Sequence, residues 1–239
     1  MIDPIFYTYA NRIKPLYEQE QPFPSQVFEN FLDPTILALL EEEASKITED
    51  EWERGLDIGI KDGQEFDEHQ WQTGKRGIRR IENMPPIMSA VCKYFNSDKF
   101  MDWVKIVTGI EDLEPDPQYR GGGYHETIPG GYLDVHKDFT YHEGITNTPF
   151  RKVNLLIYLN PVWEEEYGGY LELWDNELTK CHHKIKPISN TAVLFNTDNA
   201  PHGHPDPVSM NRRSLAFYYY DNTETLPRTE RAHWRGPDI

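Results

Sequence analysis

The chain has 239 residues, 38% of them hydrophobic and 13% aromatic, which is enough apolar material to bury a substantial core. Its 24 basic and 40 acidic residues give a formal net charge of -16 at pH 7, which disfavours binding to nucleic acid or to an anionic membrane. The two cysteines, Cys92 and Cys181, are too few for a disulfide scaffold or a zinc site of four thiolates. We expect free thiols in a reducing compartment.

The sequence also lacks the marks of a membrane or secreted protein. Its start, MIDPIFYTYANRIKPLYEQE, has no basic segment followed by an apolar run. No later segment approaches the roughly 20 apolar residues that a membrane-spanning helix needs. We therefore expect a soluble cytoplasmic protein, and make no prediction about its oligomeric state.

The first half of the chain predicts a helix-rich region. Pro15–Pro24 predicts an extended polar entry, and Val27–Leu32 predicts a short strand. Asp33 and Pro34 are the residue types that begin helices, so we expect a helix from there through Ile47. Its expected buried positions are Leu37, Leu39, Leu40 and Ala44.

The next segment, Asp50–Arg80, is polar and broken by glycines, which predicts loops or ragged strands. Pro85 and Pro86 then open a second helical region with two apolar groups. Gly109 is expected to end it, because glycine readily adopts the left-handed conformation that terminates helices.

After about Glu114 the pattern changes to short apolar or alternating runs separated by glycine pairs and prolines, which is typical of a β-sandwich or barrel. The expected strands are Tyr132–Val135, Val153–Leu159, Tyr170–Trp174, His183–Ile188, Ala192–Phe195 and Ser214–Tyr220. We predict a mainly β fold with a helical N-terminal layer, in one domain spanning 1–239. Residues 1–114 would form the helix-rich support, 115–222 a jelly-roll core (a double-stranded β-helix), and 223–239 a polar tail.

A candidate metal site begins at His136-Lys137-Asp138. Positions i and i+2 of a strand project to the same face, so the imidazole and the carboxylate converge while Lys137 points away. A third ligand is expected from the distant PHGHP segment, through His202 or His204. Two imidazoles and one carboxylate leave coordination positions open, an arrangement suited to Fe(II) that must also bind a chelating co-substrate and O2.

A candidate carboxylate site accompanies the metal site. Arg212 begins the apolar run RSLAFYYY shortly after the two histidines, and a buried guanidinium favours a bidentate carboxylate partner such as the distal carboxylate of 2-oxoglutarate. Tyr158 shares the inward face of its predicted strand with Asn154 and Leu156, so its hydroxyl could donate to the same carboxylate.

Taken together, these motifs resemble the prolyl-4-hydroxylase-like branch of the Fe(II)/2-oxoglutarate dioxygenases. The resemblance covers about Gly121–Asp221 and rests on three segments in the family's order: GGYLDVHKDF, NLLIYLNPVWEEEYGGYLELWD and NTDNAPHGHPDPVSMNRRSLAFYYY. It implies Fe(II), 2-oxoglutarate and O2 as requirements, with ascorbate to keep the iron reduced.

The resemblance also implies residue roles. The metal ligands would be His136, Asp138 and His202, because the family's spacing pairs His202 with Arg212 and leaves His204 a supporting role. The 2-oxoglutarate ligands would be Arg212 and Tyr158, with further contacts from the residues Ser214, Leu171 and Asn154. The intact carboxylate of Asp138 favours hydroxylation over the related halogenation.

The substrate is expected to be a peptidyl residue or a small molecule, and the sequence does not separate the two. The segment from Phe139 to Arg151 either forms a lid that contacts substrate or is an ordinary surface loop. Its candidate contacts are Phe139, Tyr141 and Arg151, and His125 is a further candidate at the cavity mouth, where a structural role competes. Two other functions remain open: an inactive jelly-roll binding module, and a metal-dependent hydrolase that uses the same three ligands.

Overall fold

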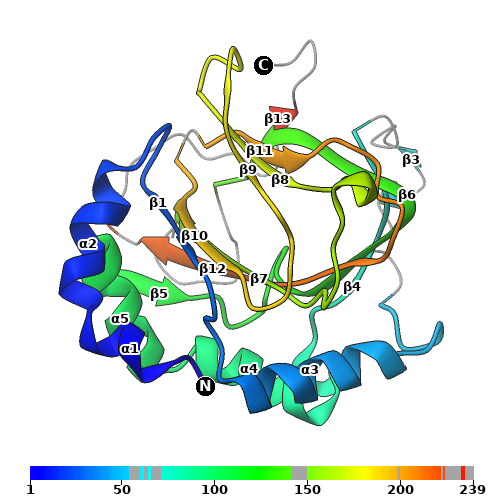
Figure 1. Ribbon diagram of the computed structural model, residues 1–239, viewed down its shortest axis with the longest axis horizontal. Coiled ribbons are helices and arrows are strands. Elements are labelled where there is room, and N and C mark those ends of the chain that lie inside the picture. Colours follow the sequence, from blue (N-terminus) through cyan, green and yellow to red (C-terminus); the bar gives the residue numbers. More distant parts are fainter. Residues whose placement is uncertain are drawn as a thin grey trace.

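A computed structural model describes residues 1–53, 71–140, 150–198, 200–221 and 223, together with the backbone alone of 60–61, 64–65 and 233–234. The described chain forms a strongly curled antiparallel sheet, and helices cover one of its outer faces (Figure 1). This confirms the predicted double-stranded β-helix with a helical N-terminal layer. Among the described residues, no helix is both long and apolar enough to cross a membrane.

The helical layer comes from two stretches of the chain. The helices are α1 Pro4–Thr8, α2 Ala10–Gln19, α3 Pro34–Lys46, α4 Pro86–Phe95 and α5 Asp98–Thr108, with short 3-10 helices η2 Ile81–Asn83 and η3 Glu165–Tyr167. The Asp33 side chain accepts hydrogen bonds from the backbone N–H groups of Thr35 and Ile36, which fixes the start of α3 as predicted. Gly109 ends α5 with a φ of 73°.

Two expectations for the helical layer are wrong. Pro15 lies inside α2 rather than in an extended segment, because Ala10 and Tyr17 are buried there and tertiary packing outweighs the hydrogen bond that proline removes. In α3, Leu40 and Ala44 are buried as expected, whereas Leu39 is 37% exposed. It lies on the opposite face of the helix from the core.

The strands form one continuous sheet with a separate hairpin. Its central order is β1-β10-β7-β12-β6-β11-β8-β9, while β4 and β13 also pair with β6 and β5 pairs with β12. The strands are β1 Ser25–Phe28, β4 Gln72–Ile78, β5 Leu113–Pro115, β6 Gly123–Lys137, β7 Phe150–Tyr158, β8 Leu171–Trp174, β9 Cys181–Ile185, β10 Ala192–Asn196, β11 His202–His204, β12 Arg212–Asp221 and β13 His233–Trp234, with β2 Ile60–Lys61 and β3 Gln64–Glu65 in the hairpin.

The 15-residue strand β6 joins the two halves of the sandwich. Its first part pairs with β12 and β4, and its last part pairs with β11. Between these parts Gly131 lies so close to Thr73 that a Cβ would stand 2.7 Å from the Thr73 carbonyl oxygen, so only glycine fits. Because of this course, β6 carries His125 at one end of the interior and His136 at the other.

Residues of β7 and β12 alternate between two environments. Leu155, Ile157, Leu215 and Phe217 pack with the helices in one large core, whereas Tyr158 belongs to a smaller cluster inside the sandwich. The alternation follows from the period of two in a strand, and it confirms that Asn154, Leu156 and Tyr158 share the inward face. The sheet therefore has a dry outer face and a polar inner face.

The polar segment from 50 to 80, where loops or ragged strands were expected, contains the irregular strand β4. β4 pairs with β6 along most of its length, despite Gly74 and Gly77. Its register shifts between Thr73 and Lys75, and this irregularity removes the simple alternation by which strands are recognised. Residues 54–59, 62–63 and 66–70 of that segment lie outside the described residues.

We predict that Leu155→Ala lowers the free energy of unfolding by about 2–5 kcal/mol, because it opens a cavity between the sheet and the helices where Leu155 is fully buried. Leu16→Ala is the matched control, because Leu16 is 60% exposed and its truncation should change stability by less than about 0.5 kcal/mol. Urea denaturation of the two variants measures both values. Equal losses would contradict this packing.

Candidate functional site

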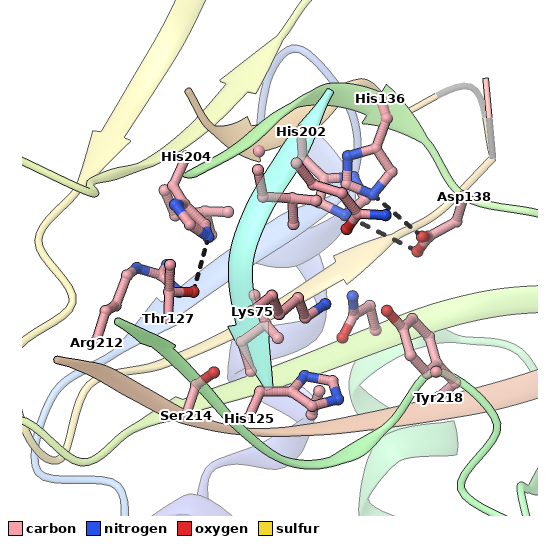
Figure 2. Close-up of a pocket in the computed structure, with 18 of the residues that line it drawn as sticks. Lys75, His125, Thr127, His136, Asp138, His202, His204, Arg212, Ser214 and Tyr218 are labelled. Carbon is pink, nitrogen blue, oxygen red and sulfur yellow. Dashed lines mark hydrogen bonds and ion pairs between the residues drawn. The ribbon is translucent and has the colours of Figure 1, made fainter. Parts of the chain in front are cut away.

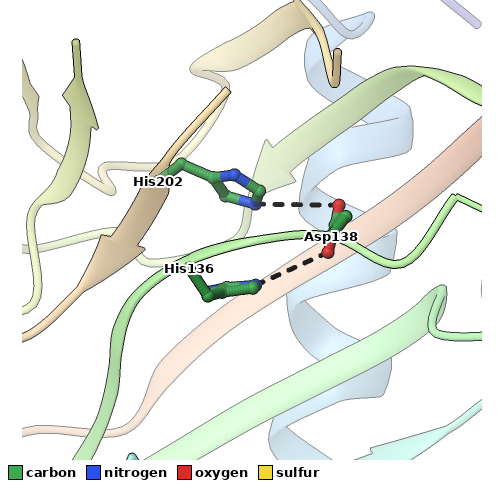
Figure 3. Close-up of side chains that lie close together, drawn as sticks. All are labelled: His136, Asp138 and His202. Atoms are coloured by element: carbon green, nitrogen blue, oxygen red, sulfur yellow. Dashed lines mark ion pairs between the residues drawn. The ribbon is translucent and has the colours of Figure 1, made fainter. Parts of the chain in front are cut away.

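Three side chains from two strands meet inside one end of the sandwich. The Nε2 atom of His136 lies 3.5 Å from Oδ1 of Asp138, and Nε2 of His202 lies 3.8 Å from Oδ2 of the same carboxylate (Figure 3). All three side chains are buried, and their ligand atoms lie within 4.8 Å of one another. The structure thus brings together the three residues that the sequence named as metal ligands.

The pairing of β11 with β6 produces this meeting. His202 stands directly opposite His136 in the antiparallel pair. Gly203 follows it, and a Cβ there would lie 2.6 Å from the Asp134 carbonyl oxygen, so the close approach of the two strands requires glycine. Asp138 comes immediately after β6 ends, on the same face as His136.

The second nitrogen of each histidine fixes its protonation. Nδ1 of His136 lies 2.9 Å from the Asp134 carbonyl oxygen, and Nδ1 of His202 lies 2.8 Å from that of Ala200. A carbonyl oxygen can only accept, so each Nδ1 carries a hydrogen, and in the neutral form of either ring Nε2 directs its lone pair toward Asp138. Burial lowers the pKa of His202 to about 4, which keeps this ring neutral at pH 7.

The carboxylate of Asp138 is ionised and incompletely partnered. Burial alone raises its pKa, but the nearby positive charge of the Arg151 guanidinium helps to outweigh burial and hold the pKa below its usual range. Nη1 of Arg151 lies 3.4 Å from Oδ1, whereas Oδ2 is buried without a hydrogen-bond partner. Two imidazole lone pairs and an unpartnered carboxylate oxygen therefore face each other.

Three acceptors without a donor between them fit a divalent cation. Deprotonated carboxylate and neutral imidazole are the ligand forms that Fe(II) takes, and each imidazole is held by the backbone carbonyl behind it, as metal-binding histidines are. His136, Asp138 and His202 could therefore hold Fe(II) through Nε2 of each ring and the Asp138 carboxylate.

The opposite end of the interior holds a buried arginine. Arg212, at the start of β12, donates from Nε to the Gly169 carbonyl oxygen at 2.7 Å and from Nη2 to the Tyr158 hydroxyl at 3.2 Å. It has no carboxylate partner among the residues that the structure describes. Gly169 has a φ of 64°, and a Cβ there would lie 2.4 Å from a methyl group of Val208, so the chain can turn over Arg212 only with glycine.

Tyr158 and Ser214 lie beside this guanidinium. The two residues are directly opposite each other in the β7–β12 pair, and both are buried. Burial raises the pKa of Tyr158, so its hydroxyl keeps its hydrogen and can donate it. Arg212, Tyr158 and Ser214 together present N–H and O–H groups to whatever occupies this end.

The other predicted co-substrate contacts also line the pocket. Leu171 contributes an apolar wall, and Asn154 has a buried Oδ1 without a hydrogen-bond partner. His204 is buried on the Arg212 side, where its Nε2 lies 3.5 Å from the Thr127 hydroxyl (Figure 2). It is not part of the group formed by His136, Asp138 and His202.

The predicted substrate residues differ in whether they line the pocket. His125 and Phe139 line the pocket, while Tyr141 lies outside the described residues. Arg151 is only 1% exposed: its guanidinium carbon lies 3.6 Å from the ring centroid of Phe139 and 3.5 Å from that of Tyr218. Arg151 thus contacts a metal-ligand candidate, and both faces of its guanidinium are covered by aromatic rings.

The pocket also contains residues that the sequence did not single out. Lys75 comes from β4, in the segment expected to form loops or ragged strands, and Tyr218 comes from the predicted strand Ser214–Tyr220. For Tyr218 a signal was available, because its even-numbered position places it on the same face of β12 as Ser214. Lys75 gave no such signal, since the irregularity in β4 hides which face it occupies.

The fold and this constellation define a class of protein: a double-stranded β-helix with a His-Asp-His site and a buried arginine. Residues 122–220 match the family model described as the 2OG-Fe(II) oxygenase superfamily. Residues 122–220 thus carry the sequence pattern of a 2-oxoglutarate- and Fe(II)-dependent oxygenase, as the motifs predicted, and this pattern implies Fe(II), 2-oxoglutarate and O2. A comparison with curated proteins by sequence found no match.

Solved structures share the fold over most of the chain. A prolyl-4-hydroxylase from Pseudomonas putida has a TM-score of 0.61 at 16% identity, covering 89% of this chain and 99% of that protein. A Trichoplax adhaerens prolyl hydroxylase, solved with a peptide fragment of hypoxia inducible factor, has a TM-score of 0.63 at 20% identity, covering 92% and 94%. HygX from Streptomyces hygroscopicus, with nickel, 2-oxoglutarate and hygromycin B bound, has a TM-score of 0.55 at 12% identity, covering 91% and 90%.

We predict that Asp138→Ala and His202→Ala each weaken Fe(II) binding by at least about 100-fold, because the loss even of a residue that supports a metal ligand costs roughly 10–100-fold. Anaerobic isothermal titration calorimetry measures the change. His204→Ala is the matched control and should alter the affinity only a few-fold. A loss in His204→Ala equal to that in His202→Ala would move the third ligand to His204.

Proposed function

We propose that this protein hydroxylates an unactivated C–H bond of a small substrate, with Fe(II) held by His136, Asp138 and His202 and 2-oxoglutarate held by Arg212 and Tyr158. One observation carries the proposal: a cluster of three acceptor atoms and a buried guanidinium without a carboxylate line the same cavity. Each group is costly to bury as it stands, and one dicarboxylate chelating a divalent metal would partner both.

The proposed roles follow from the contacts. Arg212 can pair with the distal carboxylate of 2-oxoglutarate, because its Nη1 makes no hydrogen bond with a described residue while Nε and Nη2 are anchored. Tyr158 and Ser214 can add hydroxyl donors to that carboxylate. The backbone carbonyls behind His136 and His202 keep both Nε2 atoms aimed at the metal.

When bound, Fe(II) with 2-oxoglutarate supplies the oxidising chemistry: one atom of O2 enters the substrate as hydroxyl, and the other enters succinate as CO2 is released. The protein's own residues position the reactants and exclude water. Leu156, Leu171 and Ala216 form an apolar lining between the two polar ends, which limits the water that reaches the reacting centre.

The size of the cavity bears on the substrate. Its volume is about 170 Å³, below the roughly 300–1,000 Å³ of pockets for drug-sized ligands. This favours a small molecule over a peptide as the substrate.

The direct test is anaerobic reconstitution with Fe(II), followed by addition of 2-oxoglutarate and O2 and measurement of succinate. We expect succinate formation above the protein-free rate even without substrate, and we expect the formation to stop when the metal is chelated. Hydrolysis of ester or amide substrates with no need for 2-oxoglutarate would instead identify a hydrolase. Tight metal binding with no succinate would identify an inactive binding module.

We further predict that Arg212→Met raises the KM for 2-oxoglutarate at least about 30-fold, because removing one partner of a buried charge pair costs roughly 2–5 kcal/mol. Tyr158→Phe should raise it at least about tenfold through loss of one hydrogen bond to a charged group. Arg213→Met is the matched control: the neighbouring Arg213 pairs with Glu126 at 2.7 Å and should leave the KM unchanged. Succinate assays over a 2-oxoglutarate series give the three values.

A further inference from the structure

Lys75 is an ammonium inside the same cavity that the proposed chemistry does not use. Figure 2 shows its side chain reaching into the pocket from β4, with its nitrogen on the side of Tyr218 and Asp138 rather than of Arg212. Among the charged groups near it, Asp138 has the largest effect on its pKa, ahead of Arg212 and Arg151. Lys75 has no hydrogen bond or ion pair with any described residue.

The backbone of β4 is built to direct Lys75 inward. Gln72 and Lys75 both line the pocket although they are three residues apart, a spacing that places side chains on opposite faces of a regular strand. The register shift between Thr73 and Lys75 restores Lys75 to the inner face, as β-bulges beside active sites commonly do. Gly74 makes the irregularity possible: its φ is 65°, and a Cβ would lie 2.9 Å from the Cα of Gly131.

The charges of the lining residues are unbalanced. Lys75, Arg151 and Arg212 are cationic, and Asp138 is the one carboxylate among the described residues that line the cavity. A divalent metal and the 2-oxoglutarate dianion cancel each other, so the loaded pocket keeps two positive charges in excess. Arg151 is engaged by Asp138, by the Arg120 carbonyl oxygen at 2.8 Å and by its aromatic neighbours. Among the cationic residues described in the cavity, Lys75 is therefore the one that has no partner.

The distal carboxylate of the co-substrate does not account for Lys75. In the proposed arrangement it lies at Tyr158 and Ser214, whereas Tyr218 stands four residues further along β12, about 13 Å away at 3.3 Å per residue. The nitrogen of Lys75 lies on the side of Tyr218 and Asp138 (Figure 2). A substrate in that part of the cavity would adjoin the proposed metal ligands.

We propose that Lys75 binds a carboxylate of the substrate, so that the enzyme acts on a small carboxylic acid at a C–H bond near its carboxylate. This inference rests on the proposed function and names its substrate class. Burial lowers the pKa of Lys75 to about 8, and a carboxylate beside Lys75 would favour its ammonium form and accept a strong hydrogen bond from it in this dry setting. Neutral and cationic substrates would leave it unpartnered.

The probe that tests this is trifluoroacetate, titrated by 19F NMR into protein loaded with Zn(II) and N-oxalylglycine, an unreactive analogue of 2-oxoglutarate that keeps Arg212 occupied. We expect saturable binding in the native protein. Lys75→Gln should weaken it at least about tenfold, because hydrogen bonds to charged groups contribute that much to an equilibrium. Lys75→Arg should stay within a few-fold of the native affinity, and trifluoroacetamide should not bind.

Lys137→Gln is the matched control, since Lys137 comes from β6 beside the proposed ligands but donates to Asn176 away from the cavity. Its trifluoroacetate affinity should match that of the native protein. Calorimetric binding of Zn(II) and N-oxalylglycine, and the unfolding midpoint, are measured for every variant. Equal trifluoroacetate binding in the native protein and in Lys75→Gln would overturn the inference, as would loss of N-oxalylglycine binding in Lys75→Gln, which would assign Lys75 to the co-substrate.

Two competition experiments distinguish binding of small acids from binding of peptides. Acetate should displace trifluoroacetate, whereas a capped Gly-Asp-Gly peptide should not, because the cavity is small; displacement by the peptide would overturn the assignment to small acids. Failure of the proposed function is visible separately, as a native protein that binds neither Zn(II) nor N-oxalylglycine. The trifluoroacetate titration of metal-free protein then still reports whether Lys75 binds an anion.

Discussion

The structure depends on one electrostatic constraint, the convergence of two imidazole lone pairs and a carboxylate inside a dry sandwich. No donor lies between His136, Asp138 and His202, so their proximity is unfavourable until a cation joins them. The fold supplies the rigidity that holds them together. The pairing of β11 with β6, the glycine at 203 and the two backbone carbonyls behind the rings all maintain the same arrangement. The ligand atoms are therefore held in position before a metal ion binds.

A second constraint is the difference between the charge of the protein and that of its cavity. The chain carries a formal charge of -16, yet three of the four charged side chains that line the cavity are cationic. Anions are therefore repelled by most of the surface and attracted by the interior, which favours small acids that can enter the sandwich over large polyanions. Arg212 and Lys75 enter the cavity from different strands, and the nitrogen of Lys75 lies on the side of Asp138 and Tyr218 (Figure 2). Because the two cations are apart, each can bind a different carboxylate in the proposed arrangement.

Much of the site could be predicted because its residues obey simple periodicities. His136 and Asp138 are two positions apart, and Asn154, Leu156 and Tyr158 alternate along an ordinary strand. Lys75 could not be predicted because Gly74 introduces an irregularity that reverses the face of every later residue in β4. The role of Arg151 was also out of reach, since its contacts with Asp138, Phe139 and Tyr218 join strands that are distant in sequence.

The sequence by itself determined the class of fold, the resemblance of residues 122–220 to the 2OG-Fe(II) oxygenases, and the identity of the metal-ligand and co-substrate candidates, because strand periodicity and motif order are local properties of the chain. Only the tertiary structure decided which side chains share the cavity, since that depends on strand register. The pairing of β6 with β4, β11 and β12 sets the position of Lys75 relative to His136 and Arg212. Register is fixed by burial and by close backbone contacts across the sheet, and no local pattern in the chain encodes it.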